Sequence, residues 1–138
     1  MQPLPLRLNP GDDLRLSLEA VLAWHKVSAA FVLQGIGSLS VAQLRLAGAV
    51  KPTEIRGDLE ILTLAGSLAL DGAHLHMSVA DAQGRVVGGH VAAGCLVRTT
   101  AEILLALLPD HEFTRELDAG SGYPELVVRP RSTTLPPP

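Results

Sequence analysis

A turn in the second half of the chain joins two mainly apolar segments, and it limits the possible folds more than any other feature. The segments Ala73–Val79 and Arg85–Val97 flank the turn sequence Asp81-Ala82-Gln83-Gly84. Asp is favoured at the first position of a type I turn, and Gly adopts the left-handed conformation that closes a three-residue loop with a bulge. We therefore predict a β-hairpin in which Asp81 pairs with Arg85.

The predicted hairpin brings three histidines to one face of a sheet. Alternate residues of a strand point to the same side, so His74 and His76 project together, with Cα atoms about 7 Å apart. Counting back from the turn places His90 opposite His76. A two-residue loop would instead place His90 opposite Leu75, on the other face, and a bulge at Gly88-Gly89 would also change the register. The turn chemistry favours the register in which all three rings meet.

Three converging imidazoles are a typical environment for a metal ion with one free coordination position. Structural zinc sites are usually closed and often contain thiolates, whereas three histidines plus a free position are typical of catalytic or ligand-accepting zinc. We therefore predict a mononuclear site on His74, His76 and His90, with zinc favoured and nickel, cobalt or iron allowed. The alternative is that the rings only hydrogen-bond backbone or water. Glu60 and Glu102 are the candidate acids, bases or hydrogen-bond partners of the histidines.

Two segments show the spacing of apolar residues that is typical of helices. Asp12 or Asp13 can cap a helix over Leu14–Lys26, in which apolar residues recur every three or four positions. A second helix is predicted over Ala101–Leu108, with a threonine before it as the cap and Pro109 just beyond its end.

Several further apolar segments are predicted to be strands of one domain. They are Ala29–Gln34, Val41–Leu46, Leu59–Leu70, Phe113–Leu117 and Leu126–Val128. The first two are expected to be separate strands joined at the glycines of Gly35-Ile36-Gly37-Ser38, and Gly66 is expected to mark a bend or bulge. The single domain is predicted over residues 1–128. The proline-rich tail, residues 129–138, is expected to be disordered or draped on the surface.

The composition limits the classes of partner. The net charge of −3 gives no general attraction to a phosphate backbone, and 3% aromatic residues leave few rings on which single-stranded bases could stack. Cys95 is the single cysteine, so no intramolecular disulfide can form, and its apolar neighbours predict a small buried side chain. No secretory signal is recognised, and no apolar segment reaches the roughly 20 residues that span a bilayer. We expect no membrane partner and a cytoplasmic location.

Several segments along the chain together carry a family resemblance. They are Gly35–Ser38, Gly57–Gly66, His74–His76, Gly84–His90, Thr99–Glu102 and Gly122–Tyr123. With these segments the chain resembles the plants-and-prokaryotes-conserved (PPC) domain family, in its short stand-alone prokaryotic form, over nearly all of its length to about Val128. The resemblance implies an α/β fold of the α+β kind, an antiparallel sheet with a packed helix, assembled as a homotrimer. It also implies that His74, His76 and His90 bind zinc, as in some prokaryotic members.

The resemblance also raises the question of DNA. Plant members similar to this chain carry AT-hook motifs beside the domain, and prokaryotic relatives are often labelled predicted DNA-binding proteins. This chain has no Arg-Gly-Arg-Pro segment, so the DNA label is not carried over. We expect a homotrimeric binding or regulatory module, with a protein partner or small ligand at the metal. The alternative is a small zinc-dependent enzyme using the same histidines, which needs the free coordination position to open into a concave pocket.

Overall fold

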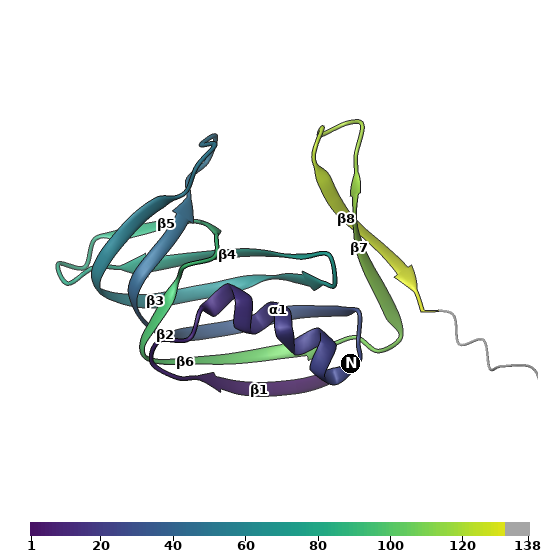
Figure 1. Ribbon diagram of the computed structural model, residues 1–138, viewed down its shortest axis with the longest axis horizontal. Coiled ribbons are helices and arrows are strands. Elements are labelled where there is room, and N and C mark those ends of the chain that lie inside the picture. The colour runs from purple at the N-terminus through teal and green to yellow at the C-terminus, as the bar shows by residue number, and fades with distance from the viewer. Residues whose placement is uncertain (132–138) are drawn as a thin grey trace, which may run out of the picture.

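Antiparallel strand pairing organises almost the whole chain. The computed structural model describes residues 1–131, in which six strands form one sheet in the order β1-β6-β2-β3-β4-β5 and two more form a separate hairpin (Figure 1). The strands are β1 (Gln2–Leu8), β2 (Ala29–Arg45), β3 (Thr53–Ala69), β4 (Gly72–Ala80), β5 (Val86–Val91), β6 (Leu96–Leu107), β7 (His111–Leu117) and β8 (Pro124–Pro130). All pairs between these strands are antiparallel, which confirms the predicted type of sheet.

The sheet curls back on itself at β5. This strand lies at the edge beyond β4, yet its last residues also pair with the end of β2, with Leu44 opposite Val91 and Arg45 opposite His90. Because β5 pairs with both β4 and β2, the four strands β2, β3, β4 and β5 form a closed circuit of pairings. This part of the sheet is visibly curved in Figure 1. One of the three histidines is thereby placed beside a basic residue of a strand far away in the sequence.

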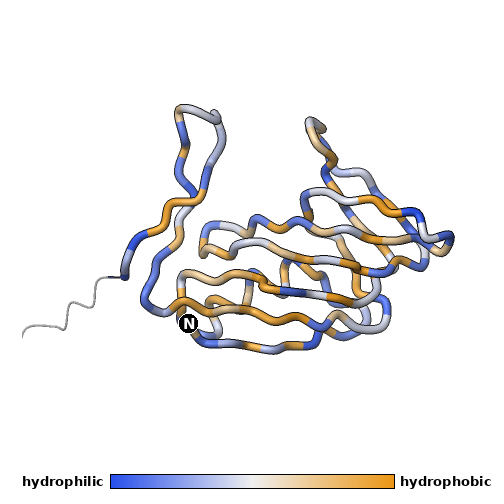
Figure 2. Tube along the Cα trace, turned by 180° about the vertical axis from the view of Figure 1, so that it is seen from behind, coloured by the Kyte–Doolittle hydropathy of each residue, from blue (hydrophilic) through white to orange (hydrophobic). Residues whose placement is uncertain are grey.

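The first predicted helix is confirmed as α1 (Leu14–His25), which packs across one face of the sheet. Asp13 caps it by accepting a hydrogen bond from the Leu16 backbone N–H at 3.0 Å, and Lys26 ends it in the left-handed conformation, with φ of 54°. The helix buries three leucines at four-residue spacing, Leu14, Leu18 and Leu22. They join a core of aliphatic side chains from the sheet, whose central strands are strongly apolar (Figure 2). At 12 residues α1 is too short to cross a membrane, and no other helix occurs among residues 1–131.

The second predicted helix, Ala101–Leu108, is wrong, because residues 101–107 of this segment belong to strand β6. Ala101, Ile103 and Leu105 face the core, as alternation in a strand requires. However, β6 lies between β1 and β2, and Ala106 on its other face is buried as well. Leu104 makes this other face apolar too, although it is 37% exposed, and periodicity alone does not distinguish such a short apolar run from a helix segment.

The two strands predicted on either side of Gly35–Ser38 are one continuous strand, β2. The glycines do not end it, because they serve a close approach between strands. Gly37 has φ of +146°, and a Cβ at this position would lie 2.2 Å from the Thr100 carbonyl oxygen of β6. Shifts of register beside Gly37 and Leu39 then bend β2 without interrupting its pairing.

The last two predicted strands pair with each other and form a hairpin that stands off the main sheet (Figure 1). Phe113 of β7 anchors this hairpin through an edge-to-face contact with Phe31, at a ring centroid separation of 5.4 Å. Strand β8 continues through Arg129 and Pro130, two residues beyond the predicted end of the domain. Residues 132–138 of the predicted tail lie outside the described part of the chain.

Candidate metal centre

The turn between β4 and β5 sets the register of the site. The Gly84 N–H donates to the Asp81 carbonyl at 2.9 Å, the Asp81 N–H donates to the Arg85 carbonyl at 3.0 Å, and Gly84 has φ of +76°. The Asp81 carboxylate also accepts hydrogen bonds from the backbone N–H groups of Gln83 and Arg85. These contacts confirm the three-residue loop with its glycine bulge. His76 lies directly opposite His90, as the turn chemistry predicted.

All three predicted histidines converge. One nitrogen from each of His74, His76 and His90 lies within 4.8 Å of the others. The Nε2 atoms of His74 and His76 are 3.0 Å apart, and the ring of His90 is centred 5.2 Å from His74 and 5.8 Å from His76. His76 is exposed, whereas His90 is half-buried. The cluster is therefore accessible from solvent on one side and backed by the sheet on the other.

Two glycines let neighbouring backbones approach closely at this cluster. Gly66 of β3 has φ of +153°, and a Cβ there would lie 2.1 Å from the His74 carbonyl oxygen. A Cβ at Gly89 would lie 2.8 Å from the Arg45 carbonyl oxygen. Neither position accepts a side chain unless the backbone moves. Together the two glycines hold β4 against β3 and β5 against β2, which fixes the spacing of the histidines.

The surroundings keep two of the imidazoles neutral. Burial lowers the pKa of His90 to about 4, with additional contributions from the charges of Arg45, His74, Arg15 and His76. Burial also lowers the pKa of His74, followed by the charges of neighbours that include His76 and Arg115, while Glu125 acts in the opposite direction. A neutral imidazole offers a nitrogen lone pair, which is the form that binds a metal.

The donor set fits a zinc ion. A tetrahedral zinc bound at about 2.0–2.1 Å by three imidazole nitrogens requires nitrogen separations of roughly 3.4 Å. The observed separations, from 3.0 Å up to a limit of 4.8 Å, bracket that value, so small ring rotations would complete the arrangement. In addition, Nδ1 of His90 is buried without a hydrogen-bond partner among residues 1–131. A buried polar atom of this kind normally has a partner, and a cation beside the ring would offset that cost.

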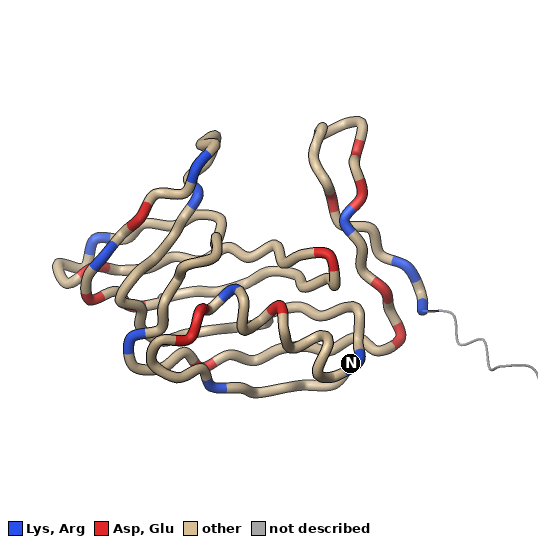
Figure 3. Tube along the Cα trace, viewed as in Figure 1, with Lys and Arg blue, Asp and Glu red and all other residues tan. Residues whose placement is uncertain are grey.

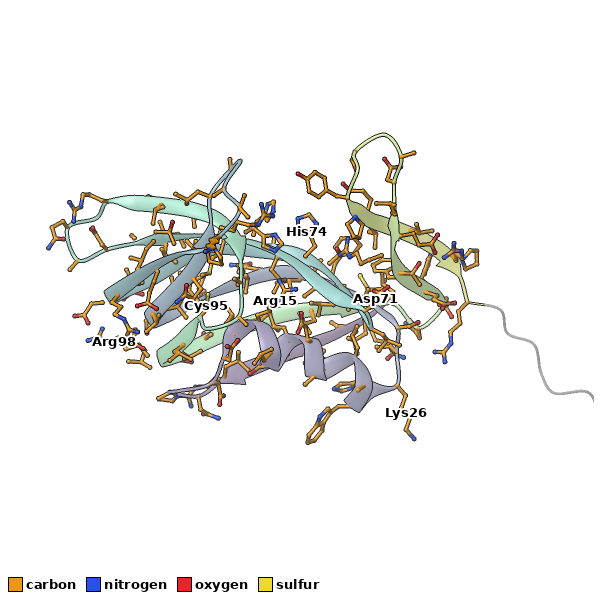
Figure 4. The ribbon with its side chains drawn as sticks, turned by 45° about the horizontal axis from the view of Figure 1, so that its top comes forward. Arg15, Lys26, Asp71, His74, Cys95 and Arg98 are labelled. Carbon is orange, nitrogen blue, oxygen red and sulfur yellow. The ribbon has the colours of Figure 1, made fainter. Side chains whose placement is uncertain are left out.

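The cluster borders an open hollow of about 840 Å³. Its walls come from the start of α1, the connection between β2 and β3, the turn before β4, and the β7–β8 hairpin. Figure 4 shows His74 on the sheet side of this hollow, facing the hairpin, with Arg15 and Asp71 on its border. The residues that line it are Arg15, Arg45, Gly48, Ala49, Val50, Asp71, Gly72, Ala73, His74, His90, Arg115, Tyr123, Pro124 and Glu125.

The structure places Glu60 and Glu102 away from the histidines. Glu60 pairs with Ala80 on β4, whereas His74 pairs with Ser67, seven positions further along β3 and thus roughly 20 Å away. Glu102 lies on β6 opposite Ile36. The carboxylates that do border the hollow are Asp71 and Glu125.

Sequence reasoning missed the charged residues of the hollow. Arg15, Arg45 and Arg115 lie on a helix, on the end of a strand and on a separate hairpin. No spacing in the sequence relates residues on such distant elements. The pairing of β2 with β5 and the position of the β7–β8 hairpin bring them together, and both are properties of the tertiary structure.

A comparison with known families and proteins gives the chain's relatives. The model of the Plants and Prokaryotes Conserved (PCC) domain matches residues 1–109. Two proteins named Bifunctional protein GlmU, from Synechococcus sp. strains JA-2-3B'a(2-13) and JA-3-3Ab, are 50% and 49% identical over 91% and 96% of this chain. The chain spans about a fifth of the length of those two relatives (20% and 21%).

Solved structures share the fold over almost the full chain. A hypothetical protein from Salmonella enterica is 39% identical with a TM-score of 0.92, and 95% of each chain is covered. A metal-containing protein from Archaeoglobus fulgidus is 24% identical with a TM-score of 0.73, covering 92% of this chain and 94% of that one. A protein from Ralstonia eutropha whose name proposes DNA binding is also 24% identical, with a TM-score of 0.72, and the match covers 91% of this chain and 89% of that one. The last two show a shared fold alone.

Proposed function

Because this chain belongs to the Plants and Prokaryotes Conserved domain family, we propose that it is a metal-binding module that holds zinc on His74, His76 and His90. The observation that carries the proposal is the convergence of three imidazole nitrogens within 4.8 Å of one another. One of the three residues, His90, also has a buried Nδ1 without a hydrogen-bond partner among residues 1–131. The fourth coordination position would face the open hollow, where a small ligand or a group of a protein partner could reach the metal. The protein of the same fold from Archaeoglobus fulgidus contains a metal, which agrees with a metal site in this fold.

The proposal includes self-association as a homotrimer in the cytoplasm, the assembly implied by the family resemblance. The surface offers apolar area for such contacts, because Phe31 and Ile36 on β2 and Leu104 on β6 are exposed by 39%, 46% and 37%. Large exposed apolar patches commonly mark protein interfaces. Light scattering coupled to gel filtration measures the mass directly. Three chains per particle is the expected value, and a single chain at all concentrations would contradict the trimer.

A small zinc-dependent enzyme is the second candidate, and the open hollow beside His74 and His90 favours it. When bound, zinc supplies a Lewis acid or a water of lowered pKa. The chain's own contribution would be to bind and orient a substrate in the hollow. There Asp71 or Glu125 could hold a proton, in place of the more distant Glu60 and Glu102.

Elemental analysis of untagged protein tests the proposed metal site. Wild-type protein should contain about one zinc per chain, and His90→Ala should lose it because two imidazoles bind zinc much more weakly than three. His111→Ala is the matched control, since His111 is exposed on β7 and lies outside the cluster. Zinc that is absent from wild-type protein even after zinc is added and the excess removed would overturn the proposal. Zinc retained by His90→Ala would contradict the assigned ligands.

A further inference from the structure

The hollow beside the histidines contains two arginines without ion pairs. No carboxylate among residues 1–131 lies within 4.0 Å of the guanidinium groups of Arg45 and Arg115. Arg45 donates one long hydrogen bond, 3.5 Å, to the Ala49 carbonyl, and Arg115 donates one to Ser67 Oγ at 2.7 Å. Both side chains are half-buried, and several of their N–H donors have no protein acceptor among residues 1–131. Among the exposed arginines, Arg7 and Arg131 also have no ion pair within residues 1–131, whereas four reach a carboxylate, namely Arg56, Arg85, Arg98 and Arg129.

The third arginine of the hollow, Arg15, has a structural role. Arg15 pairs with Glu19 at 2.9 Å and donates to the carbonyls of Ala73 and Val91 at 2.8 Å each. These bonds connect the start of α1 to the ends of β4 and β5. Arg15 therefore contributes charge to the hollow while its donors are already engaged, which leaves Arg45 and Arg115 as the free binding groups.

The charge of the hollow favours an anion. Because Arg15 is balanced by its ion pair with Glu19, the lining has two further arginines, Arg45 and Arg115, against two acids, Asp71 and Glu125, before any metal binds. Asp71 is already engaged, because its carboxylate accepts the Arg115 backbone N–H at 2.8 Å. A zinc ion bound beside the hollow would add two positive charges to this balance. Figure 3 shows basic residues at the upper end of β2 and, among acidic ones, on the β7–β8 hairpin.

The rim of the hollow is suited to the organic part of a ligand. Val50 and Tyr123 belong to two different connections, the one between β2 and β3 and the one between β7 and β8. Their side chains are 91% and 70% exposed, although both line the same hollow. Its volume of about 840 Å³ is within the range of roughly 300–1,000 Å³ that is usual for small-molecule sites. An apolar body placed between these two side chains would bury surface that is otherwise exposed to water.

We propose that the hollow binds a small organic acid, whose carboxylate or phosphate group is held by Arg45 and Arg115 beside the histidine-bound metal. The apolar body of the acid lies between Val50 and Tyr123. The part of the proposal that concerns the metal rests on the proposed zinc site, whereas the part that concerns the arginines does not. A guanidinium presents paired N–H donors that match the oxygens of either acid group.

Calorimetric titration with chosen probes tests this site on the zinc-loaded protein. The probes are benzoate and phenyl phosphate, each of which has an acid group and an apolar ring. Inorganic phosphate, which has no ring, and benzyl alcohol, which has no acid group, are the controls. Benzoate or phenyl phosphate should bind measurably, and benzyl alcohol should not. Arg45→Gln should weaken binding of the acid by about tenfold or more, because a charge-assisted hydrogen bond is lost. Arg98→Gln, which removes an exposed arginine outside the hollow, should change nothing.

The zinc content of each variant separates the two proposals. Zinc that binds normally while neither acid binds would overturn the organic-acid site and leave the metal proposal intact. Equal affinity of wild-type protein and Arg45→Gln for the acids would also overturn it. If wild-type protein lacks zinc but binds an acid through Arg45, the arginine site stands and the metal site fails. Arg115→Gln tests the second proposed arginine in the same titration. Far-UV circular dichroism checks that the β7–β8 hairpin of this variant remains folded.

Discussion

A substitution at Gly66 tests how the site is positioned. An alanine Cβ there would lie 2.1 Å from the His74 carbonyl oxygen and 2.8 Å from the Leu75 Cα. Ordinary contact begins near 3.4 Å, so β4 would have to move by about 1.3 Å against a packed core. The positive φ of 153° adds about 1–3 kcal/mol of backbone strain, and forced movement in a packed structure adds about 1–3 kcal/mol. Gly66→Ala should therefore lower the free energy of unfolding by about 2–6 kcal/mol.

Gly57→Ala is the matched control on the same strand. Gly57 has φ of +133°, yet no atom lies within 4 Å of the position of its Cβ. It should show the backbone strain alone, about 1–3 kcal/mol. Urea unfolding of the metal-free proteins gives both values at one protomer concentration. Far-UV circular dichroism is the suitable readout because Trp24 is 84% exposed and would report poorly on the core. Equal losses from the two substitutions would refute the argument that close approach at His74 requires Gly66.

Four further predictions concern other parts of the chain. Burial raises the pKa of the Cys95 thiol to about 11, so an aromatic disulfide reagent should label native protein negligibly at pH 8 and completely in urea. This pKa lies above the ordinary value of 9.0, so the stability that the protonated thiol contributes is fully present below pH 9 and is lost as the pH rises through about 11. Urea unfolding at pH 8 and pH 11 measures this loss. Asp13→Ala should cost about 2–3 kcal/mol in urea unfolding, because Asp13 accepts the Leu16 N–H at 3.0 Å and the Gly94 N–H at 2.6 Å, while Asp13→Asn should cost less. The purified chain should shift no duplex DNA at low salt, since its net charge is −3 and phosphate contacts dominate such binding, and a shift that weakens steeply with salt would contradict this.

Local rules were enough to predict the histidine cluster. The turn at Asp81 and Gly84 determined the loop length, and the loop length determined which residues of β4 and β5 face each other. Each step involves neighbours within one hairpin, where register follows from turn geometry. The helix α1 was predictable for the same reason, because its cap and its apolar spacing lie within its own sequence.

The remaining errors arise where a distant strand determines the local structure. The segment Ala101–Leu108 has the composition of a helix, yet pairing with β1 and β2 makes it a central strand. Gly37 suggested a chain turn, whereas it accommodates the approach of Thr100 from β6. The basic residues of the hollow depend on the pairing of β2 with β5, in which Arg45 lies opposite His90. None of these partners is close in sequence, so propensity and spacing carried no sign of them.

X-ray absorption at the zinc edge tests the three-histidine metal site most directly. The account predicts about three nitrogens at about 2.0–2.1 Å with the scattering pattern of imidazole rings, and one further light atom. It predicts no sulfur near 2.3 Å, because Cys95 is buried in the core and lies outside the histidine cluster. A sulfur shell, or a shell of oxygens without the imidazole pattern, would contradict the site on His74, His76 and His90.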